Sequence, residues 1–350
     1  MFLSLYDDCG LCGCKEGIRL VSKSELFGKK CVVLGGKGFI GSWMVNYLKA
    51  QDCFVSSVDV TSRSFLVTKE DRFQQLDLRD SQLVWVALQD ADYVFNFAAN
   101  MGGIGYITRV HGEVMRDNSL INLGVLEACR KHDVSRLFLA SSACVYPTHL
   151  QSVPSVSGLR EVDAYPALPD SAYGWEKLYA EQLAQAYRED YGLDIRVARF
   201  HNVYGPFGTF KGGREKAPAA LCRKISLVED GGVVEVWGDG LQTRSFLYVS
   251  DAVHAVWLMM TMPCRVPLNI GSDVLISIRD LAMLICELSG KSVEFQFDVS
   301  KPQGVRGRNA DLTLITEVLG WQPKVSYQEG LLATYKWIDS MVHCKGGGNV

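Results

Sequence analysis

Short apolar runs alternate with stretches of helical periodicity along the first part of the chain. An apolar, β-branched run at 29–36 enters a glycine turn, and residues 39–50 then place hydrophobic side chains at helical spacing. Buried strands of parallel sheets read as nearly continuous apolar runs. The same pattern predicts further strands at 53–60, 93–99, 136–142 and 194–200, and helices at 113–131 and 171–190. This alternation predicts an α/β fold with a doubly wound parallel sheet of the Rossmann type.

The pattern changes after about residue 205. Segment 205–220, GPFGTFKGGREKAPAA, is polar and rich in glycine, and long loops of this kind often carry function. Beyond it we expect helices at 217–228, 251–261, 277–289 and 328–341, with short strands at 233–237 and 244–248. We therefore expect three parts: an N-terminal extension at 1–28, a Rossmann domain at 29–205 with return segments near 240–265, and a mainly substrate-binding, mixed α/β domain at 206–345.

Composition and charge exclude several classes of protein. The chain has 350 residues, of which 48% are hydrophobic and 21% charged, enough for one large α/β unit or two joined lobes. A net charge of -3 gives no support for nucleic-acid binding. No apolar run approaches the roughly 18 residues of a membrane span. The N-terminus lacks a basic flank and reaches Asp7 and Asp8 early, so we expect neither a signal peptide nor an anchor.

The eleven cysteines are scattered, mostly inside apolar segments. That distribution is typical of reduced, buried thiols in a cytoplasmic protein and not of a disulfide scaffold. Cys9, Cys12 and Cys14 are closely spaced, but no second Cys/His pair lies near them in the sequence. We therefore expect no metal site.

The first turn has the features of a dinucleotide site. Gly35, Gly38 and Gly41 lie between a predicted strand and helix, where bare backbone and a helix N-terminus favour a pyrophosphate. Asp59 ends the next strand, and a carboxylate there bonds ribose hydroxyls and repels a 2′-phosphate. These residues predict NAD in preference to NADP, although nearby Arg63 is a contrary indication.

Further contacts to the dinucleotide follow from the same region. We expect Phe39 and Ile40, inside the glycine turn, to contact the cofactor. Asp77 is a candidate contact to the adenine, and its alternative role is the N-cap of a helix at 78–88.

A tyrosine and a lysine four residues apart supply candidate chemistry. Tyr173 and Lys177 lie on one face of a predicted helix. A neighbouring ammonium and a positively charged nicotinamide both favour phenolate, which makes Tyr173 a credible base for an alcohol proton. Ser142, at the end of a predicted strand, can bond the same hydroxyl. The alternative is an ordinary surface pair, because this spacing is common by chance.

Several motifs together resemble a known superfamily. GGKGFIG at 35–41, Asp59, DLR at 77–79, SSACVY at 141–146 and YGWEK at 173–177 resemble the extended short-chain dehydrogenase/reductases. MGGIGYI at 101–107, segment 198–224, WGDGLQTRSF at 237–246 and GVRGRN at 304–309 are similar to the plant-type GDP-mannose 3,5-epimerases. The resemblance covers roughly residues 29–342.

The resemblance implies a specific reaction. Members of this family oxidise the sugar at C4 with tightly held NAD, invert C3 and C5, and return the hydride. GDP-mannose becomes GDP-L-galactose, with GDP-L-gulose from inversion at C5 alone, and in plants this feeds ascorbate synthesis. The family's proton-transfer pair falls on Cys144 and Lys216. From the residues alone, Cys144 is as readily a buried small residue and Lys216 a solvated loop charge.

The resemblance also implies the substrate contacts. A nucleotide diphosphate is anionic, and the second half of the chain is rich in Arg and Lys. Arg308 is a less certain neighbour, with a surface ion pair as its alternative, and His201 is expected to be a core histidine. The substrate contacts carried over are Gly102, Ser142, Ala143, Cys144, Asn202, Glu215, Lys216, Ala217, Lys224, Gln242, Thr243, Arg244 and Arg306.

Two departures and two alternatives remain open. Leu34 stands where the turn usually has threonine, and Asn100 replaces an expected acid before MGG. The first alternative is another nucleotide-sugar epimerase or a dehydratase, although Ala143 and Cys144 fill the places of a dehydratase's acidic pair. The second is a non-catalytic NAD-binding sensor. By analogy with the superfamily we expect a homodimer that pairs through the helices at 113–131 and 171–190.

Overall fold

The computed structural model describes residues 25–344, so Cys9, Cys12 and Cys14 lie outside the described residues. A seven-stranded, all-parallel sheet forms the larger part of the molecule, in the order β10-β6-β5-β4-β1-β2-β3. Its strands are β1 (Lys30–Leu34), β2 (Phe54–Asp59), β3 (Arg72–Gln75), β4 (Tyr93–Asn96), β5 (Arg136–Ser142), β6 (Ile195–Phe200) and β10 (Leu268–Ile270). The doubly wound Rossmann-type sheet predicted from the sequence is confirmed.

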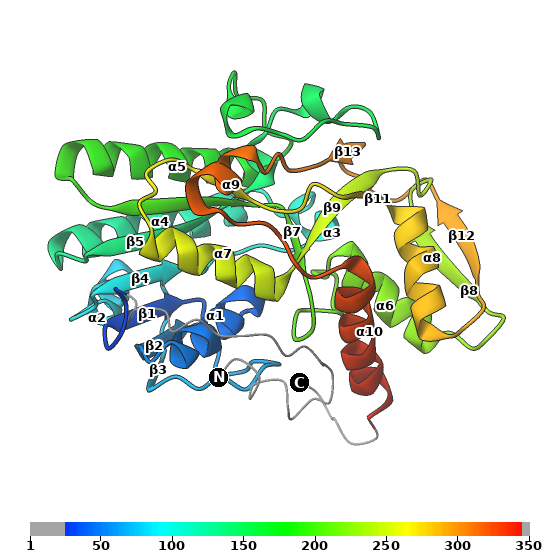
Figure 1. Cartoon of the computed structure of the whole chain (residues 1–350), viewed down its shortest axis with the longest axis horizontal. Coiled ribbons are helices and arrows are strands. Elements are labelled where there is room, and N and C mark those ends of the chain that lie inside the picture. Colours follow the sequence, from blue (N-terminus) through cyan, green and yellow to red (C-terminus); the bar gives the residue numbers. More distant parts are fainter. Residues whose placement is uncertain (1–24, 345–350) are drawn as a thin grey trace.

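Helices cover both faces of this sheet because its strands alternate their side chains between two apolar cores. Cys31 and Val33 of β1 point into one core, and Val32 and Leu34 point into the other. The first core packs against α1 (Phe39–Ala50), α7 (Val249–Thr261) and α9 (Thr313–Leu319). The second packs against α2 (Ser81–Ala87), α4 (Gly112–Lys131) and α5 (Ala172–Tyr191). Figure 1 shows these helices around the sheet at the left of the molecule.

The smaller part stands at the right of Figure 1. A third apolar core joins α6 (Ala217–Leu227), α8 (Ile278–Ser289) and α10 (Tyr327–His343) to short strands. Strand β9 (Thr243–Tyr248) pairs with β7 (Asn202–Tyr204), β11 (Leu275–Ser277) and β13 (Gly307–Arg308), and β8 (Val233–Trp237) pairs with β12 (Glu294–Asp298). The remaining helices are α3 (Ile104–Ile107) and the 3-10 turns Ala143–Val145, Thr148–Gln151 and Glu161–Ala164.

The chain passes between the two parts more than once. It leaves the large sheet after β6 and returns with α7 and β10. Pairing of β7 with β9 places the continuation of β6 beside the second half of the chain. The predicted boundaries at 205 and 345 stay a prediction, and β10 adds residues 268–270 to the large sheet.

Candidate active site

A cavity of about 630 Å³ lies at the carboxyl ends of the large sheet and extends to the smaller part. Ligands of open α/β sheets bind at this edge, where the strand order reverses between β1 and β4. Most of the residues predicted from the sequence line this one cavity. They are Gly35, Gly38, Phe39, Ile40, Gly41, Gly102, Ser142, Ala143, Cys144, Tyr173, Lys177, Asn202, Glu215, Lys216, Ala217, Lys224, Gln242 and Arg244.

The turn between β1 and α1 has room for backbone only. Gly35 has φ 76, and a Cβ there would lie 2.8 Å from the amide nitrogen of Ala98. A Cβ on Gly41 would lie 2.1 Å from the carbonyl oxygen of Gly35. Gly38 is the N-cap of α1 and no side chain caps that helix. The bare turn and uncapped helix N-terminus fit the pyrophosphate of a dinucleotide.

Asp59 ends β2 beside this turn. Its carboxylate accepts hydrogen bonds from the amides of Lys37, at 3.0 Å, and Thr61, at 3.2 Å. The carboxylate is therefore fixed against the glycine turn, although Asp59 is not among the residues that line the cavity.

Asp77 also lies outside the cavity lining. Its carboxylate binds Arg79, and the resulting ion pair lowers the pKa of Asp77. The alternative role proposed for Asp77 is wrong, because Asp80 is the N-cap of α2 and accepts the amide of Gln82 at 2.8 Å. The helix begins after this cap, at Ser81, and ends at Ala87, so it is shorter than the predicted 78–88.

Ser142, Tyr173 and Lys177 meet in the centre of the cavity. Ser142 ends β5, and its hydroxyl accepts the amide of Cys144 at 3.2 Å. Tyr173 and Lys177 share one face of α5, with the ammonium 5.6 Å from the centre of the tyrosine ring. Burial raises the pKa of the Tyr173 phenol, the charge of Cys144 adds to the rise, and a hydrogen bond with Ser142 opposes it. Tyr173 is thus a protonated phenol in the chain alone, and phenolate needs a further positive charge.

Cys144 lies one turn beyond Ser142 and contacts a buried arginine. Nη1 of Arg308 lies 3.2 Å from the Cys144 sulfur, and Nη2 binds Asp170 at 2.9 Å. Burial opposes the charge of Arg308, but Cys144 as thiolate and Asp170 outweigh it and raise the pKa of Arg308. The sequence-based alternative of a surface ion pair is therefore wrong, since Arg308 is only 7% exposed. Its proximity to the thiol was not predicted.

Lys216 faces the same thiol from the long loop before α6. It is the N-cap residue of α6, with Pro218 in the first turn of the helix. Burial lowers the pKa of the Lys216 ammonium, and the charge of Cys144 opposes part of this effect. The alternative of a solvated loop charge is wrong. The thiol of Cys144 and the ammonium of Lys216, whose pKa is lowered, thus lie near each other in one cavity, and both are groups that can carry a proton.

The loop that carries Lys216 packs directly on the MGG segment. The amide of Gly103 donates to the carbonyl of Arg214 at 2.9 Å, and a Cβ on Gly103 would lie 2.3 Å from the carbonyl oxygen of Glu215. The guanidinium of Arg214 stacks 3.9 Å from the centre of the Tyr106 ring. The glycine at 103 therefore sets the distance between this loop and the large sheet.

Cations dominate the far wall of the cavity. Arg244 lies near Arg308, and burial lowers the pKa of Arg244 to about 9, so its guanidinium stays charged near neutrality. Arg244 donates to the carbonyls of Thr243 and Gln303 and pairs with no carboxylate among the described residues. Oε1 of Gln242 is buried without a hydrogen-bond partner in the same part of the structure. This wall suits an anionic, polar ligand.

Other predicted contacts have partners of their own. Asn202 donates to the carbonyl of Ser245, and Lys224 donates to the carbonyl of Glu235. Thr243 and Arg306 do not line the cavity: Thr243 bonds the carbonyl of Pro154, and Arg306 pairs with Asp239 at 3.0 Å. Arg308, which was not among the predicted substrate contacts, lines the cavity beside the thiol, and the role of Arg306 stays a prediction.

Asn100 and His201 have structural contacts. Asn100 donates to Asp117 and accepts from Tyr106, which ties the MGG segment to α4. Nε2 of His201 lies 3.2 Å from Oδ1 of Asn269, and burial lowers the pKa of His201 to about 3. His201 is therefore a neutral, buried histidine, as expected. Across residues 25–344 we find no group of three His, Cys, Asp or Glu side chains that could hold a metal ion.

Comparison with known proteins places this geometry in a family. The model of the NAD dependent epimerase/dehydratase family matches residues 31–271. GDP-mannose 3,5-epimerase 1 of Oryza sativa subsp. indica is 43% identical over 314 residues, which cover 89% of this chain and 82% of the relative.

Solved structures agree with the fold. UDP-glucose 4-epimerase of Thermotoga maritima, solved with UDP-glucose, superposes with a TM-score of 0.82 at 28% identity, over 90% of this chain and 100% of that one. UDP-glucose 4-epimerase of Thermus thermophilus, solved with NAD, has a TM-score of 0.76 at 26% identity, over 88% and 98%. With its bare glycine turn and its Ser-Tyr-Lys group, the chain belongs to the NAD dependent epimerase/dehydratase family.

Proposed function

We propose that this chain is a GDP-mannose 3,5-epimerase, an isomerase that converts GDP-mannose to GDP-L-galactose, with GDP-L-gulose from inversion at C5 alone. The observation that carries the proposal is the proximity of Cys144 and Lys216 in the cavity that also holds Ser142 and Tyr173. A 4-epimerase needs no such thiol and lysine. The 43% identity to the rice enzyme supports the same substrate.

Oxidation at C4 makes the neighbouring carbons acidic. The glycine turn would hold NAD, which would supply the hydride chemistry of this step. Tyr173 takes the proton of the sugar hydroxyl and later gives it back, while Ser142 bonds the same oxygen. Lys177 adds a positive charge beside the tyrosine ring, which favours the phenolate.

Inversion at C3 and C5 needs a proton removed from one face of the sugar and supplied to the other. Cys144 and Lys216 are the proposed pair, because they approach the cavity from different segments, one after β5 and one before α6. Arg308 places a fixed positive charge beside the sulfur of Cys144, at 3.2 Å. Burial lowers the pKa of Lys216, which makes its ammonium a better proton donor than an exposed lysine.

The cationic wall holds the diphosphate of the nucleotide in this proposal. Arg244 is half-buried and has no carboxylate partner among the described residues. An anion beside it stabilises the charged guanidinium and offsets the cost of its burial. Lys224 and the unpartnered Oε1 of Gln242 offer further polar contacts in the same cavity.

Deuterium exchange tests the proposal. The purified protein, incubated with GDP-mannose in deuterated water, should place deuterium at both C3 and C5, detected by NMR of the nucleotide sugar. Tyr173→Phe should abolish exchange, since no ketone forms. Absence of label at both carbons would refute the epimerase reading, and bound NAD without any turnover would favour a sensor.

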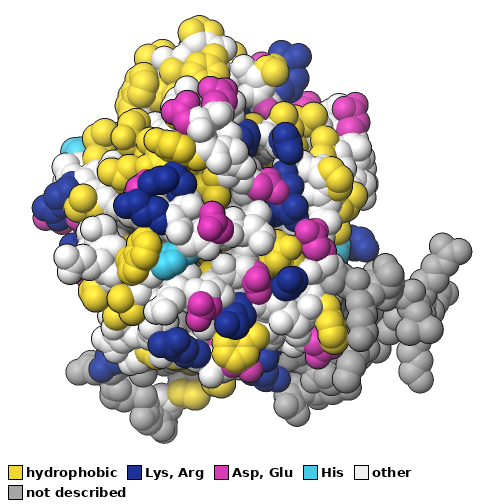
Figure 2. Space-filling view, turned by 90° about the vertical axis from the view of Figure 1, so that its left-hand side faces the viewer, with side chains coloured by type: hydrophobic (Ala, Val, Ile, Leu, Met, Phe, Trp, Pro, Cys, Tyr) yellow, Lys and Arg dark blue, Asp and Glu magenta, His cyan; other side chains and the backbone are white. Residues whose placement is uncertain are grey.

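We further propose a cytoplasmic homodimer that serves ascorbate biosynthesis. Side chains on the outer faces of α4 and α5 support the dimer, because large hydrophobic residues remain exposed there. They are Met115, Leu120 and Leu123 of α4 and Trp175 and Tyr179 of α5. No helix in the described part of the chain is long and apolar enough to cross a membrane. Figure 2 shows hydrophobic side chains gathered in the upper part of one face of the molecule.

A further inference from the structure

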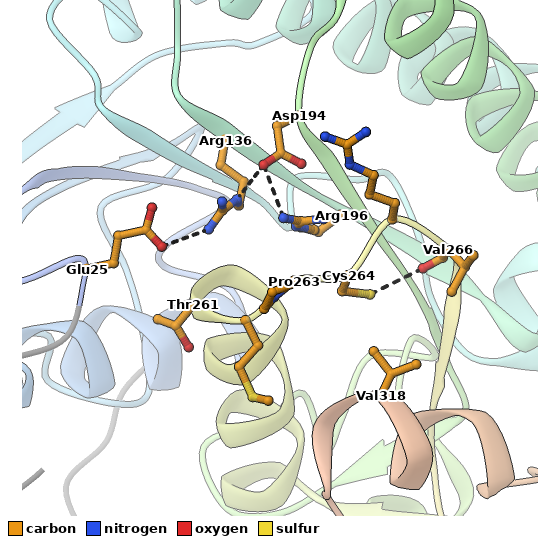
Figure 3. Close-up of a pocket in the computed structure, with 11 residues that line it drawn as sticks. Glu25, Arg136, Asp194, Arg196, Thr261, Pro263, Cys264, Val266 and Val318 are labelled. Atoms are coloured by element: carbon orange, nitrogen blue, oxygen red, sulfur yellow. Dashed lines mark hydrogen bonds and ion pairs between the residues drawn. The ribbon is translucent and has the colours of Figure 1, made fainter. Parts of the chain in front are cut away.

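A second cavity, of about 520 Å³, lies at the opposite end of the sheet from the candidate active site. It borders the first residues of β5 and β6 and the segment that follows α7, as Figure 3 shows. None of its lining residues lines the larger cavity. The active-site cavity begins where the same two strands end, at Ser142 and Phe200.

Guanidinium groups outnumber carboxylates around this cavity. Arg136, Arg196 and Arg265 line it, together with the acids Glu25 and Asp194. Nε of Arg136, at 2.7 Å, and Nη2 of Arg196, at 3.1 Å, share one oxygen of Asp194. In Figure 3 these three side chains converge on one point. The third cation, Arg265, is exposed and has no hydrogen-bond or ion-pair partner among residues 25–344.

Arg196 retains unused donors. It is 4% exposed, and its Nε and Nη1 have no hydrogen-bond partner in the described structure. Buried polar groups are nearly always paired, and leaving a charged donor unpaired is costly. The only thiol beside it among the described lining residues, Cys264, makes its hydrogen bond with the carbonyl of Val266 at 3.5 Å. Two donors of Arg196 thus lie at the wall of this cavity without an acceptor among the described residues.

We propose that this cavity binds a small oxyanion, a phosphate or carboxylate group, held between Arg196 and Arg265. The planar guanidinium fork matches the oxygens of both groups. A bound anion adds the missing acceptors and joins β5, β6 and the segment after α7. Because it binds the folded chain, it also stabilises the fold, by an amount that grows with the logarithm of the anion concentration above its dissociation constant.

Calorimetric titration of the full chain with inorganic phosphate and with succinate tests this site, against chloride at equal ionic strength. We expect binding of at least one oxyanion and a rise in unfolding temperature. Arg265→Ala changes an exposed residue and should weaken binding about tenfold, the loss of one charge-assisted contact. Arg196→Gln should weaken it further. The matched control is Arg72→Ala, at an exposed arginine of the edge strand β3.

A third variant separates this site from the catalytic cavity. Arg244→Ala removes a cation of the larger cavity and should leave oxyanion binding at the second cavity unchanged. Binding that disappears in Arg244→Ala but persists in Arg265→Ala would overturn the proposal, as would no binding of either oxyanion. If Arg196→Gln does not fold, Arg265→Ala decides alone, and unaltered binding in it refutes the site.

Discussion

The thiol of Cys144 lies within reach of two cations of different character. Arg308 contacts it at 3.2 Å and is held in place by Asp170, whereas Lys216 enters from a loop and is stripped of much of its hydration. A fixed guanidinium supplies positive charge beside the sulfur without giving up a proton, because arginine stays charged in proteins. The lysine is the group that can exchange one. The arginine thus provides a fixed charge beside the thiol, and the lysine provides an exchangeable proton.

We predict that Cys144→Ala separates oxidation from inversion. Without the thiol, proton exchange at C3 and C5 should fall by about 10²–10⁴-fold, the usual contribution of a positioned acid or base. Oxidation should persist, visible as transient NADH fluorescence on addition of GDP-mannose. Cys286→Ala, at a partly buried thiol outside the cavity, is the control. Equal loss of oxidation and exchange would contradict a pure proton-transfer role.

His201 should make stability depend on pH. Its pKa is lowered to about 3 by burial, whereas an unfolded histidine titrates near ~6.5. Between these values the unfolded chain binds more protons, so stability is full above pH ~6.5 and falls as the pH drops toward 3. Lowering the pH from 6.5 to 5 should cost about 2 kcal/mol.

Urea unfolding at several pH values measures this dependence. His201→Gln should flatten the slope, because the amide takes up no proton in this range. His149→Gln, at an exposed histidine, is the matched control and should retain the slope. A slope that survives in His201→Gln would assign the titration to another group.

At the scale of elements, the contact between the MGG segment and the Lys216 loop positions the lysine. Gly103 touches the backbone of Arg214 and Glu215, and no side chain fits between them. The backbone of Gly103 is extended, so its dihedral angles allow alanine. The methyl group of alanine would nevertheless clash with the loop. The separation of loop and sheet is therefore fixed by the absence of one methyl group.

Gly103→Ala should displace the Lys216 loop. We expect deuterium exchange to fall by about 10²-fold, since small misplacements of catalytic groups have effects of this size. The unfolding temperature should change little, because the loop lies at the surface of the cavity. Gly112→Ala is the control, as a Cβ there meets nothing within 4 Å. If Gly103→Ala exchanges deuterium at the rate of the wild-type protein, the loop adapts to the added methyl group and the prediction is wrong.

Local patterns predicted most of the elements and left the long-range contacts open. The glycine turn and the Tyr173–Lys177 spacing are short-range features, and both are in place. The contact of Arg308 with Cys144 joins residues 164 positions apart, and no periodicity marks such a pair. The same limit applies to Arg306, whose ion pair with Asp239 joins residues 67 positions apart, and its role as a substrate contact stays a prediction. Short strands such as β7, β10 and β13 were missed because two or three residues carry no usable pattern.

For the whole molecule, the exposed apolar faces of α4 and α5 predict a dimer. Leu120 and Tyr179 are 46% and 51% exposed, on helices that pack side by side against the large sheet. A hydrophobic patch of this kind on a protein surface marks an interaction site. None of these exposed residues lines the cavity, so pairing through this patch would leave the active site open.

We predict that Leu120→Glu shifts the protein toward monomer. A charge at the centre of an apolar interface costs several kcal/mol unless paired, which is enough to weaken association by two orders of magnitude or more, at about 1.4 kcal/mol per tenfold. Light scattering coupled to size-exclusion chromatography measures the change. Val67→Glu, at an 83% exposed residue elsewhere, should leave the mass unchanged. A monomeric wild-type protein would refute the dimer outright.

The spread of the active-site residues along the chain has a consequence for the order of folding. The cavity is built from residues spread over most of the chain length. They include Gly35 of the glycine turn, Cys144, Lys216 of the long loop, and Arg308, which contacts the thiol. Contacts between distant residues form slowly, because long loops must close first. During refolding, helical signal should therefore return well before turnover does. A nascent chain released before Arg308 is synthesised would have the glycine turn but no complete active site.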